Sequence, residues 1–316
     1  MRSGSSLTRL ALVATIVAVA TSCSRDRGRV SVDAGDREIV RVVSLSPSTT
    51  ETLFAIGAGP LVVGRSRFCD TPPEARALPS VGGYTDPSYE AIFALTPTLV
   101  VGARGPAGPR LEARLREHHV ATFFPETESV AQIEGMIVDL GRAVGREAAA
   151  RAVATETHTR IERVAARVRG LPTPRVLMLF DVEPIVAAGP SSFPDDLLAR
   201  AGAKNAVTEG GPYPVLGLER VLALDPDVVI DTTAAASHAK TGIDEHAPGW
   251  SKLRAVREHR VVALRDESVL RPGPRIADAV ETLAKVIHPD VAGDGASRPS
   301  GNATTSATAI PIAPAK

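Results

Sequence analysis

The chain has 316 residues, and its 36 Lys and Arg balance its 36 Asp and Glu, so the formal net charge is zero. The sequence contains no basic block and only 3% aromatic residues, which excludes the clustered cationic surface of a nucleic-acid-binding protein. The same balance excludes an acidic disordered chain, so we expect a folded protein with its own core.

Residues 1–23 have the pattern of a lipoprotein signal peptide. Arg2 and Arg9 precede the apolar run "LALVATIVAVA", which is too short to span a bilayer as a mature helix. The following "ATSC" resembles a bacterial lipoprotein cleavage box, in which Cys23 becomes the lipidated N-terminus, although Ala20 stands where such boxes usually have Leu. The alternative is ordinary signal cleavage with an incidental Cys23. Lipid chains would tether the protein to a membrane without a spanning helix.

The remaining cysteine points to a core without disulfides, and both ends of the mature chain are expected to lie outside that core. If Cys23 is lipidated, Cys69 has no partner. A lone Cys is far more often a small buried hydrophobe than a metal ligand. Residues 24–38 are polar and aperiodic, as expected of a flexible tether. Residues 290–316 are rich in Ala, Ser, Thr, Gly and Pro, which predicts a disordered tail.

One sequence motif, here called the repeated phrase, occurs twice in similar form. The stretch "YEAIFALTPTLVVG" begins at Tyr89, and "LERVLALDPDVVID" begins at Leu218. Each has a Glu near its start, then an apolar helical pattern, then Leu-x-Pro and a run of branched apolar residues. An internal repeat decides the architecture, so we predict two lobes of one plan.

The first copy lies in an N-terminal lobe, residues 39–126. Ser48 and Glu51 have the spacing of a capping box, and Gly57 suits a left-handed helix end. The expected elements are the strand "RVVSLS", the helix "SPSTTETLFAIGAG", the strand "LVVGRS", a short helix in the repeated phrase, the strand "TLVVG", the helix "RLEARLREHH" and the strand "VATFF".

The second copy lies in a C-terminal lobe, residues 171–289. The expected elements are the strand "RVLMLF", the helix "SFPDDLLARAGAKN", a helix in the repeated phrase, the strand "DVVID", the helix "WSKLRAVREHR" and the strand "VVALRD". Strands alternate with helices in both halves, which favours an α/β fold with parallel sheets and right-handed crossovers.

Residues 127–170 have no counterpart in the repeat and predict two connecting helices, "SVAQIEGMIVDLGRAVG" and "REAAARAVATETHTRIERVAARVRG". In the second helix Val153, Ile161, Val164 and Val168 fall near one face. About 23 helical residues reach about 35 Å, enough to cross both lobes. Two lobes on such a spine leave a cleft, and ligands bind in interdomain clefts and at the carboxyl ends of parallel strands.

This layout resembles the class III periplasmic binding proteins of ABC importers, and within them most closely the cobalamin-binding proteins, with ferric-siderophore and haem binders as relatives. The resemblance covers residues 39–288. It implies a monomer in the periplasm or cell envelope that carries a macrocyclic ligand, without a cofactor, to a permease dimer and its ATPase. The motifs that carry it are "RVVSLSPSTTETLFAIGAG", "VGRSRFCDTPPEARALPSVGGY", "YEAIFALTPTLVV", "LERVLALDPDVVI" and "RPGPRI".

Glu90 and Glu219 open the short helix at the same place in each copy of the phrase. A carboxylate at a helix N-terminus gains about 0.3–1 kcal/mol from the helix dipole, which is the structural alternative. The resemblance implies that each carboxylate instead pairs with an arginine of the permease dimer, one per lobe.

Tyr84 and Tyr213 each stand six residues before that Glu, in turn-rich stretches. We expect them to face each other across the cleft and to hold a flat macrocycle between two rings. The alternative is that each Tyr packs its own loop. The cobalamin-binding proteins carry Trp at both positions, and because Tyr also coordinates ferric iron or haem, those ligands remain alternatives.

Three further residues match positions that line the site in the cobalamin-binding proteins or lie on loops expected at the cleft. Phe68 matches an aromatic lining position, with a core Phe as its alternative. Arg271 matches an arginine of the cleft that could donate to amide or phosphate oxygens, whereas Arg275 could form a local salt bridge. Arg104 lies on a loop after a strand.

The two rival functions are a metal-ion receptor and an enzyme. A metal-ion receptor would place His and carboxylates from both lobes on one ion, but the seven histidines form no such spaced set, and His158 and His288 are expected to face solvent. An enzyme would need a nucleophile elbow, a phosphate-binding loop or a Cys pair, and the sequence has none of these. The pattern therefore favours a binding protein without catalytic residues and without a metal site.

Overall fold

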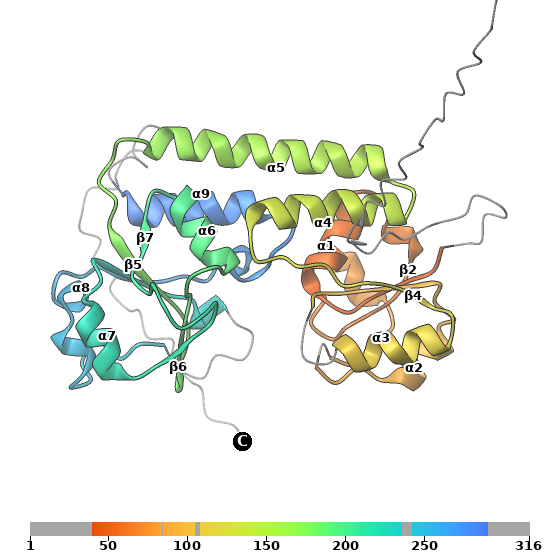
Figure 1. Cartoon of the computed structure of the whole chain (residues 1–316), viewed down its shortest axis with the longest axis horizontal. Helices are drawn as coiled ribbons and strands as arrows, with labels where there is room; N and C mark the ends of the chain where they lie inside the picture. Colours follow the sequence, from red (N-terminus) through yellow and green to blue (C-terminus); the bar gives the residue numbers. More distant parts are fainter. Residues whose placement is uncertain (1–39, 84, 105–107, 236–241, 290–316) are drawn as a thin grey trace, which may run out of the picture. The chain divides into compact units, whose positions relative to one another are not determined.

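A computed structural model gives the fold of the chain (Figure 1). It describes residues 40–83, 85–104, 108–235 and 242–289. Among these residues, no helix is both long enough and apolar enough to cross a membrane. The predictions for Cys23, Tyr84, the signal peptide, the tether and the tail lie outside the described residues.

The N-terminal lobe is built on four parallel strands in the order β2-β1-β3-β4, each joined to the next by helical segments, as predicted. Its elements are β1 (Val42–Ser44), α1 (Pro47–Ala55), η1 (Gly59–Leu61), β2 (Val62–Arg65), η2 (Pro73–Ala77), α2 (Tyr89–Ala94), β3 (Leu99–Val101), α3 (Gly108–Glu117) and β4 (Ala121–Phe123).

Helix α1 is capped differently from the prediction. The hydroxyl of Ser46 accepts the backbone N–H of Thr49 at 3.4 Å, so the cap lies two residues before Ser48. The carboxylate of Glu51 does not return to the helix N-terminus, because two arginines from the C-terminal lobe bind it. The predicted capping box is therefore wrong, whereas Gly57 has the expected left-handed conformation, with φ 71°.

Helices α4 (Val130–Ala143) and α5 (Glu147–Val168) connect the lobes. Helix α5 packs against α4 and also against α9 of the C-terminal lobe, and in Figure 1 α4 and α9 lie along different parts of α5. The predicted apolar face of α5 is largely confirmed, since only Val153 of the four named residues is not fully buried. The buried residues of α5 are Ala150, Ala154, Thr157, Ile161, Val164 and Val168.

The C-terminal lobe has a six-stranded sheet in which β10-β9-β5-β6-β8 are neighbours and β7 pairs with β5. Its elements are β5 (Arg175–Val182), β6 (Ile185–Ala187), α6 (Phe193–Arg200), β7 (Lys204–Asn205), β8 (Val215–Leu216), α7 (Leu218–Leu224), β9 (Val228–Asp231), η3 (Thr233–Ala235), η4 (Trp250–Lys252), α8 (Arg254–Arg257), β10 (Val261–Ala263), η5 (Glu267–Leu270) and α9 (Ile276–Ile287).

This second sheet is mixed, where the sequence predicts only parallel strands. Strand β5 continues to Val182, and the chain returns from Ile185 as antiparallel β6, which pairs in turn with antiparallel β8. So short a connection permits only an antiparallel pair. The predicted helix "WSKLRAVREHR" is also divided, because Leu253 between η4 and α8 is extended and buries its side chain.

The internal repeat is visible in the backbone itself. The residue between Leu and Pro in the repeated phrase is left-handed in both copies, with φ 43° at Thr96 and 39° at Asp225. The histidines at the ends of the next helices match as well, with φ 58° at His119 and 54° at His259. Non-glycine residues seldom adopt this conformation, so two matched pairs support one plan used twice.

Each sheet packs one face into a core shared by the two lobes. Val42 of β1 and Val176 of β5 belong to one continuous cluster that also contains side chains of α4, α5 and α9. The neighbouring residues Val43 and Leu177 point to the opposite faces, where each lobe has a separate core. Both faces are therefore buried, as in most parallel sheets.

The repeated-phrase helices lie on these separate faces. Ile92 of α2 belongs to the core formed by the N-terminal lobe alone, and Val221 of α7 belongs to the core formed by the C-terminal lobe alone. The faces covered by α4, α5 and α9 are the other ones. The first turns of α2 and α7 are thus presented to solvent by equivalent parts of the two lobes.

Candidate functional site

Two of the predicted ligand residues follow strands of the N-terminal sheet. Phe68 comes three residues after β2, and Arg104 comes three residues after β3. Strands β2 and β3 flank β1 on either side. Both side chains therefore belong to segments at the carboxyl edge of this parallel sheet, which is where α/β proteins bind ligands.

Acidic partners accompany the cations at this edge. The guanidinium of Arg67 lies 5.3 Å from the centroid of the half-buried Phe68 ring and 2.5 Å from a carboxylate oxygen of Asp86. The hydrogen bond from Arg67 holds the pKa of Asp86 below its usual value. Arg104 Nε lies 2.8 Å from Glu126 Oε1. Both arginines are thus paired with carboxylates, and the pairs carry no net charge.

Tyr213 packs away from its own loop. Its ring meets the Phe180 ring of β5 edge to face, with centroids 5.8 Å apart, and its hydroxyl donates to Glu128 Oε2 at 2.8 Å. Burial and the adjacent carboxylate of Glu128 raise the pKa of the Tyr213 phenol well above its ordinary value. Tyr213 is still 41% exposed. It therefore offers a neutral phenol whose ring has free surface.

Glu128 is placed by the segment before α4. The same oxygen that receives the Tyr213 hydroxyl also accepts the backbone N–H of Phe193 at 3.3 Å. Tyr213, α6 and the connecting segment are therefore held together by one carboxylate. Neither Glu128 nor Phe180 was predicted, because their contacts with Tyr213 join positions far apart in the sequence.

Arg271 is almost enclosed, with 12% of its side chain exposed. Its guanidinium binds Glu51 Oε1 at 2.9 Å, Glu267 Oε2 at 2.5 Å and Asp70 Oδ1 at 3.2 Å. Burial alone would lower the pKa of Arg271, but the surrounding carboxylates raise it. The donors predicted to meet a ligand are thus directed at three carboxylates.

Arg275 joins the same cluster. Its Nε binds Glu51 Oε2 at 2.7 Å and its Nη2 binds Glu51 Oε1 at 3.0 Å, so its ion pair is long-range and not the local one considered for it. The hydrogen bond to Glu51 raises the pKa of Arg275. The sequence did contain one signal for Glu51, which is the only charged residue of α1.

The two carboxylates predicted to dock a permease are equivalent in the structure. Glu90 lies in the first turn of α2 and Glu219 in the first turn of α7, and both are exposed. Ser88 caps α2 through the N–H of Ala91, whereas α7 has Gly217 at its cap position without a side-chain cap. Within the part of the chain that the structure describes, neither carboxylate has an ion-pair partner.

The histidines in the described part of the chain form no ligand set. In the described residues, no group of three or more His, Cys, Asp or Glu side chains could hold a metal ion. The expectation that His288 faces solvent is wrong, since only 8% of it is exposed. It follows α9, and its backbone N–H still bonds Ala284. His158 is exposed and lies 3.1 Å from Glu134, as expected of a surface residue.

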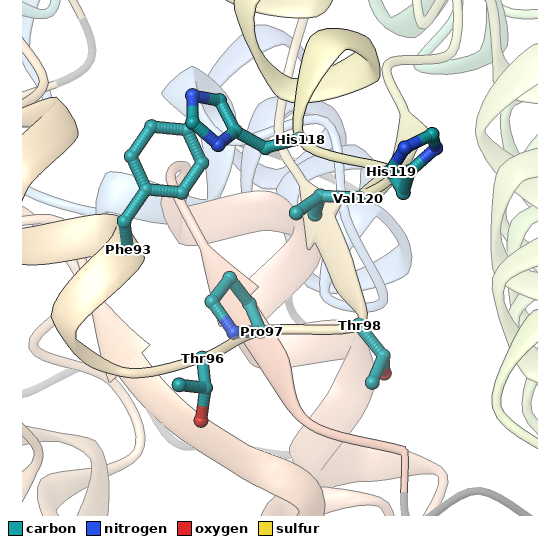
Figure 2. Close-up of a pocket in the computed structure, with 7 residues that line it drawn as sticks. All are labelled: Phe93, Thr96, Pro97, Thr98, His118, His119 and Val120. Atoms are coloured by element: carbon teal, nitrogen blue, oxygen red, sulfur yellow. The ribbon is translucent and has the colours of Figure 1, made fainter.

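A cavity of about 550 Å³ lies elsewhere on the N-terminal lobe (Figure 2). Thr98 and Val120 on its wall precede β3 and β4, so it opens at the amino edge of the sheet, opposite the edge that carries Phe68 and Arg104. The rings of Phe93 and His118 contact each other on its wall, with centroids 4.2 Å apart and ring planes inclined by 42°. It is lined by Phe93, Thr96, Pro97, Thr98, His118, His119 and Val120.

Comparisons with known proteins agree with this architecture. The model of a family described as "Periplasmic binding protein" matches residues 42–268. The chain is 27% identical over 261 residues to YvrC of Bacillus subtilis, an uncharacterised ABC transporter substrate-binding lipoprotein. That match covers 80% of this chain and 82% of YvrC.

Two solved structures are similar over nearly their whole length. The periplasmic haem-binding protein RhuT from Roseiflexus is 28% identical with a TM-score of 0.71, covering 80% of this chain and 99% of RhuT. The periplasmic vitamin B12-binding protein BtuF of Vibrio cholerae is 26% identical with a TM-score of 0.69, covering 80% of this chain and 98% of BtuF.

Proposed function

Since the chain belongs to the family of periplasmic binding proteins, we propose that it captures cobalamin or a related corrinoid outside the cytoplasm and delivers it to an ABC importer. As a substrate-binding protein of an ABC transporter it carries a small ligand and catalyses no reaction. Its partners are a permease and the ATPase that drives it. The choice of ligand rests on the chemistry of the described site residues.

The observation that carries the corrinoid proposal is that the cations at the candidate site are paired with acids. Arg67 pairs with Asp86, and Arg104 with Glu126. A corrin ring is rimmed by uncharged amides, which paired side chains can meet with hydrogen bonds. Haem carries two propionates, which would have to replace Asp86 and Glu126 in these exposed ion pairs.

The state of Tyr213 supports the same ligand. A Tyr that coordinates ferric iron must first lose its proton. Glu128 accepts that proton in a hydrogen bond, and its negative charge disfavours a phenolate beside it. The ring of a neutral, partly exposed phenol suits stacking against an apolar macrocycle. We therefore infer that Tyr213 acts as a ring and not as an iron ligand.

Haem is the second candidate, because a haem-binding protein is among the similar solved structures. A ferric siderophore is the third. All three fit a family in which loops at strand ends determine the ligand.

Titration of the purified protein with cyanocobalamin, haemin and a ferric siderophore tests the proposal. We expect heat of binding with the corrinoid and a Kd at least about tenfold tighter than for either iron compound, a difference of about 1.4 kcal/mol. Tight binding of haemin or the siderophore, without heat from the corrinoid, would overturn the first choice.

Two variants of Tyr213 are part of this titration. Tyr213→Phe keeps the ring and should stay within about threefold of the wild-type Kd, whereas Tyr213→Ala should weaken corrinoid binding about tenfold, because stacking on one aromatic ring contributes about 0.5–1.5 kcal/mol beyond the area that it buries. If Tyr213 coordinated iron, Tyr213→Phe would lose as much haemin affinity as Tyr213→Ala.

We further propose that Cys23 anchors the protein to a membrane by lipid. Its place after an apolar run and small residues supports this, as does the lipoprotein relative. Cells producing the wild-type chain should incorporate labelled fatty acid into it, and Cys23→Ala should abolish that label and leave the protein out of the membrane fraction. Cys69→Ala is the matched control and should retain the label. Equal labelling of Cys23→Ala would contradict the proposal.

A further inference from the structure

An ion cluster, here called the interlobe clasp, joins the two lobes through a buried carboxylate. It consists of Glu51, Arg271 and Arg275. Glu51 is 4% exposed, and its two oxygens receive three hydrogen bonds from the two guanidiniums. Glu51 belongs to α1 of the N-terminal lobe, whereas Arg271 and Arg275 bracket the turn before α9. The contact between Arg271 and Glu51 spans 220 positions of the sequence.

The backbone of that turn is pressed against α1. A Cβ added at Gly273 would lie 3.3 Å from both the Cα and the carbonyl oxygen of Ser48, so the turn lies close against the helix and a side chain there would make a tight contact. The hydroxyl of Thr157, on α5, donates to the carbonyl of Pro274 at 3.4 Å. The clasp therefore lies where both lobes and the connecting helix meet.

The N-terminal side of the clasp is stiffened by buried hydroxyls. Ser44 Oγ lies 2.8 Å from Thr49 Oγ1 and accepts from Thr50 Oγ1 at 2.8 Å, and Ser46 Oγ lies 2.9 Å from Thr49 Oγ1. All four side chains are buried. These bonds tie the first turn of α1 to the end of β1, so Glu51 projects from a fixed element.

The clasp also reaches the segment that carries Phe68. Arg271 binds Asp70 Oδ1 at 3.2 Å, and its Nη1 is 3.4 Å from Thr71 Oγ1. Asp70 is two residues from Phe68. A guanidinium of the C-terminal lobe therefore restrains a loop of the N-terminal lobe that is expected to line the ligand.

We propose that the clasp fixes the spacing of the lobes before ligand binds, and that Arg271 is a positioning residue for the Phe68 loop and not a ligand contact. Buried ion pairs add little net stability, but they impose one geometry, because any other arrangement leaves a charge unpaired. The effect on lobe spacing does not depend on the ligand. The effect on binding rests on the function proposed above.

The spacing is measured by electron paramagnetic resonance distances in the full chain without ligand. Spin labels at Ala113→Cys on α3 and Ala223→Cys on α7 report one lobe each, and both sites are exposed. Glu51→Gln and Arg271→Gln should each broaden the distance distribution at least about twofold. Arg142→Gln removes two ion pairs confined to α4 and the start of α5 and should leave the distribution unchanged.

Ligand titration of the same variants, without labels, separates positioning from contact. A shared clasp predicts that Glu51→Gln and Arg271→Gln each weaken corrinoid binding by about tenfold and that the double variant is no weaker than the worse single one. A ligand contact by Arg271 predicts unchanged distances and normal binding by Glu51→Gln, with the loss of affinity confined to Arg271→Gln, and this result would overturn the proposal. If cobalamin is the wrong ligand, the titration fails for the wild type while the distance result still stands.

Discussion

Replacing both Glu90 and Glu219 by Lys is expected to abolish uptake of the ligand by cells, while the purified protein keeps its Kd within about twofold. Both carboxylates are exposed at the first turns of equivalent helices. The resemblance to class III binding proteins implies that each meets an arginine of the permease. Two reversed charges would place like charges opposite each other at both ends of the interface, at a cost of several kcal/mol.

The positions of the two residues in the structure indicate that the double variant tests docking and not folding. Helices α2 and α7 pack on cores that belong to one lobe each, away from the shared core, so their first turns can change charge without disturbing the contacts between lobes. The structural role of either Glu is small, since a carboxylate at an exposed helix N-terminus contributes about 0.3–1 kcal/mol. Folding should therefore survive both substitutions.

Uptake of labelled ligand by cells carrying the double variant is the measurement, with calorimetry of the purified protein beside it. Glu156→Lys reverses an exposed carboxylate on α5 and serves as the matched control that should transport normally. Normal uptake by the double variant would refute docking through these residues. Loss of ligand affinity would instead assign them to the ligand site.

Much of the fold was accessible from the sequence because the repeat imposes local backbone requirements. The Leu-x-Pro of the repeated phrase closes its helix with a left-handed residue in both copies, at Thr96 and Asp225. Proline disfavours a helical residue before it, so this break is set within a few residues of chain. Gly57 ends α1 for a similarly local reason.

The remaining features of the fold depend on contacts between residues that are far apart in the sequence, so no short stretch of sequence contains them. Strand β8 is only Val215–Leu216, too short for a periodic pattern, and it exists because β6 offers it an edge. Ser48 and Glu51 satisfy the local spacing of a capping box, yet Glu51 bonds two arginines more than 200 positions away. Tertiary ion pairing outweighed the local rule, and no signal in the sequence names the partners.

The candidate ligand site was likewise only partly predictable from the sequence. The resemblance to the cobalamin-binding proteins implied Phe68, and the end of an apolar run placed Arg104 on a loop after a strand; the structure has both on segments at the carboxyl edge of the sheet. The sequence did not indicate that Arg104 pairs with Glu126 or that Tyr213 pairs with Glu128. Those acids determine the charge that a ligand meets, so the chemistry of the site depends on side chains that only the fold brings together.

Replacing both Arg271 and Arg275 by Met is expected to lower the free energy of unfolding by about 3–5 kcal/mol, the usual cost of leaving a buried carboxylate without its cations. Glu51 would keep its place in α1, 4% exposed, with neither guanidinium. Urea unfolding measures this loss, and an unchanged slope with denaturant would show that the folded state stays compact.

The triple variant that adds Glu51→Met decides whether the loss comes from the stranded charge. Methionine has a similar length and no charge, and replacing all members of a buried ion cluster by apolar residues is often neutral. The triple variant should therefore recover most of the stability, although it should not recover the fixed lobe spacing, because apolar side chains have no directional bonds. If the triple variant is as unstable as the double, the destabilisation comes from lost packing of the arginine stems, and Glu51 is not the residue that requires the two cations.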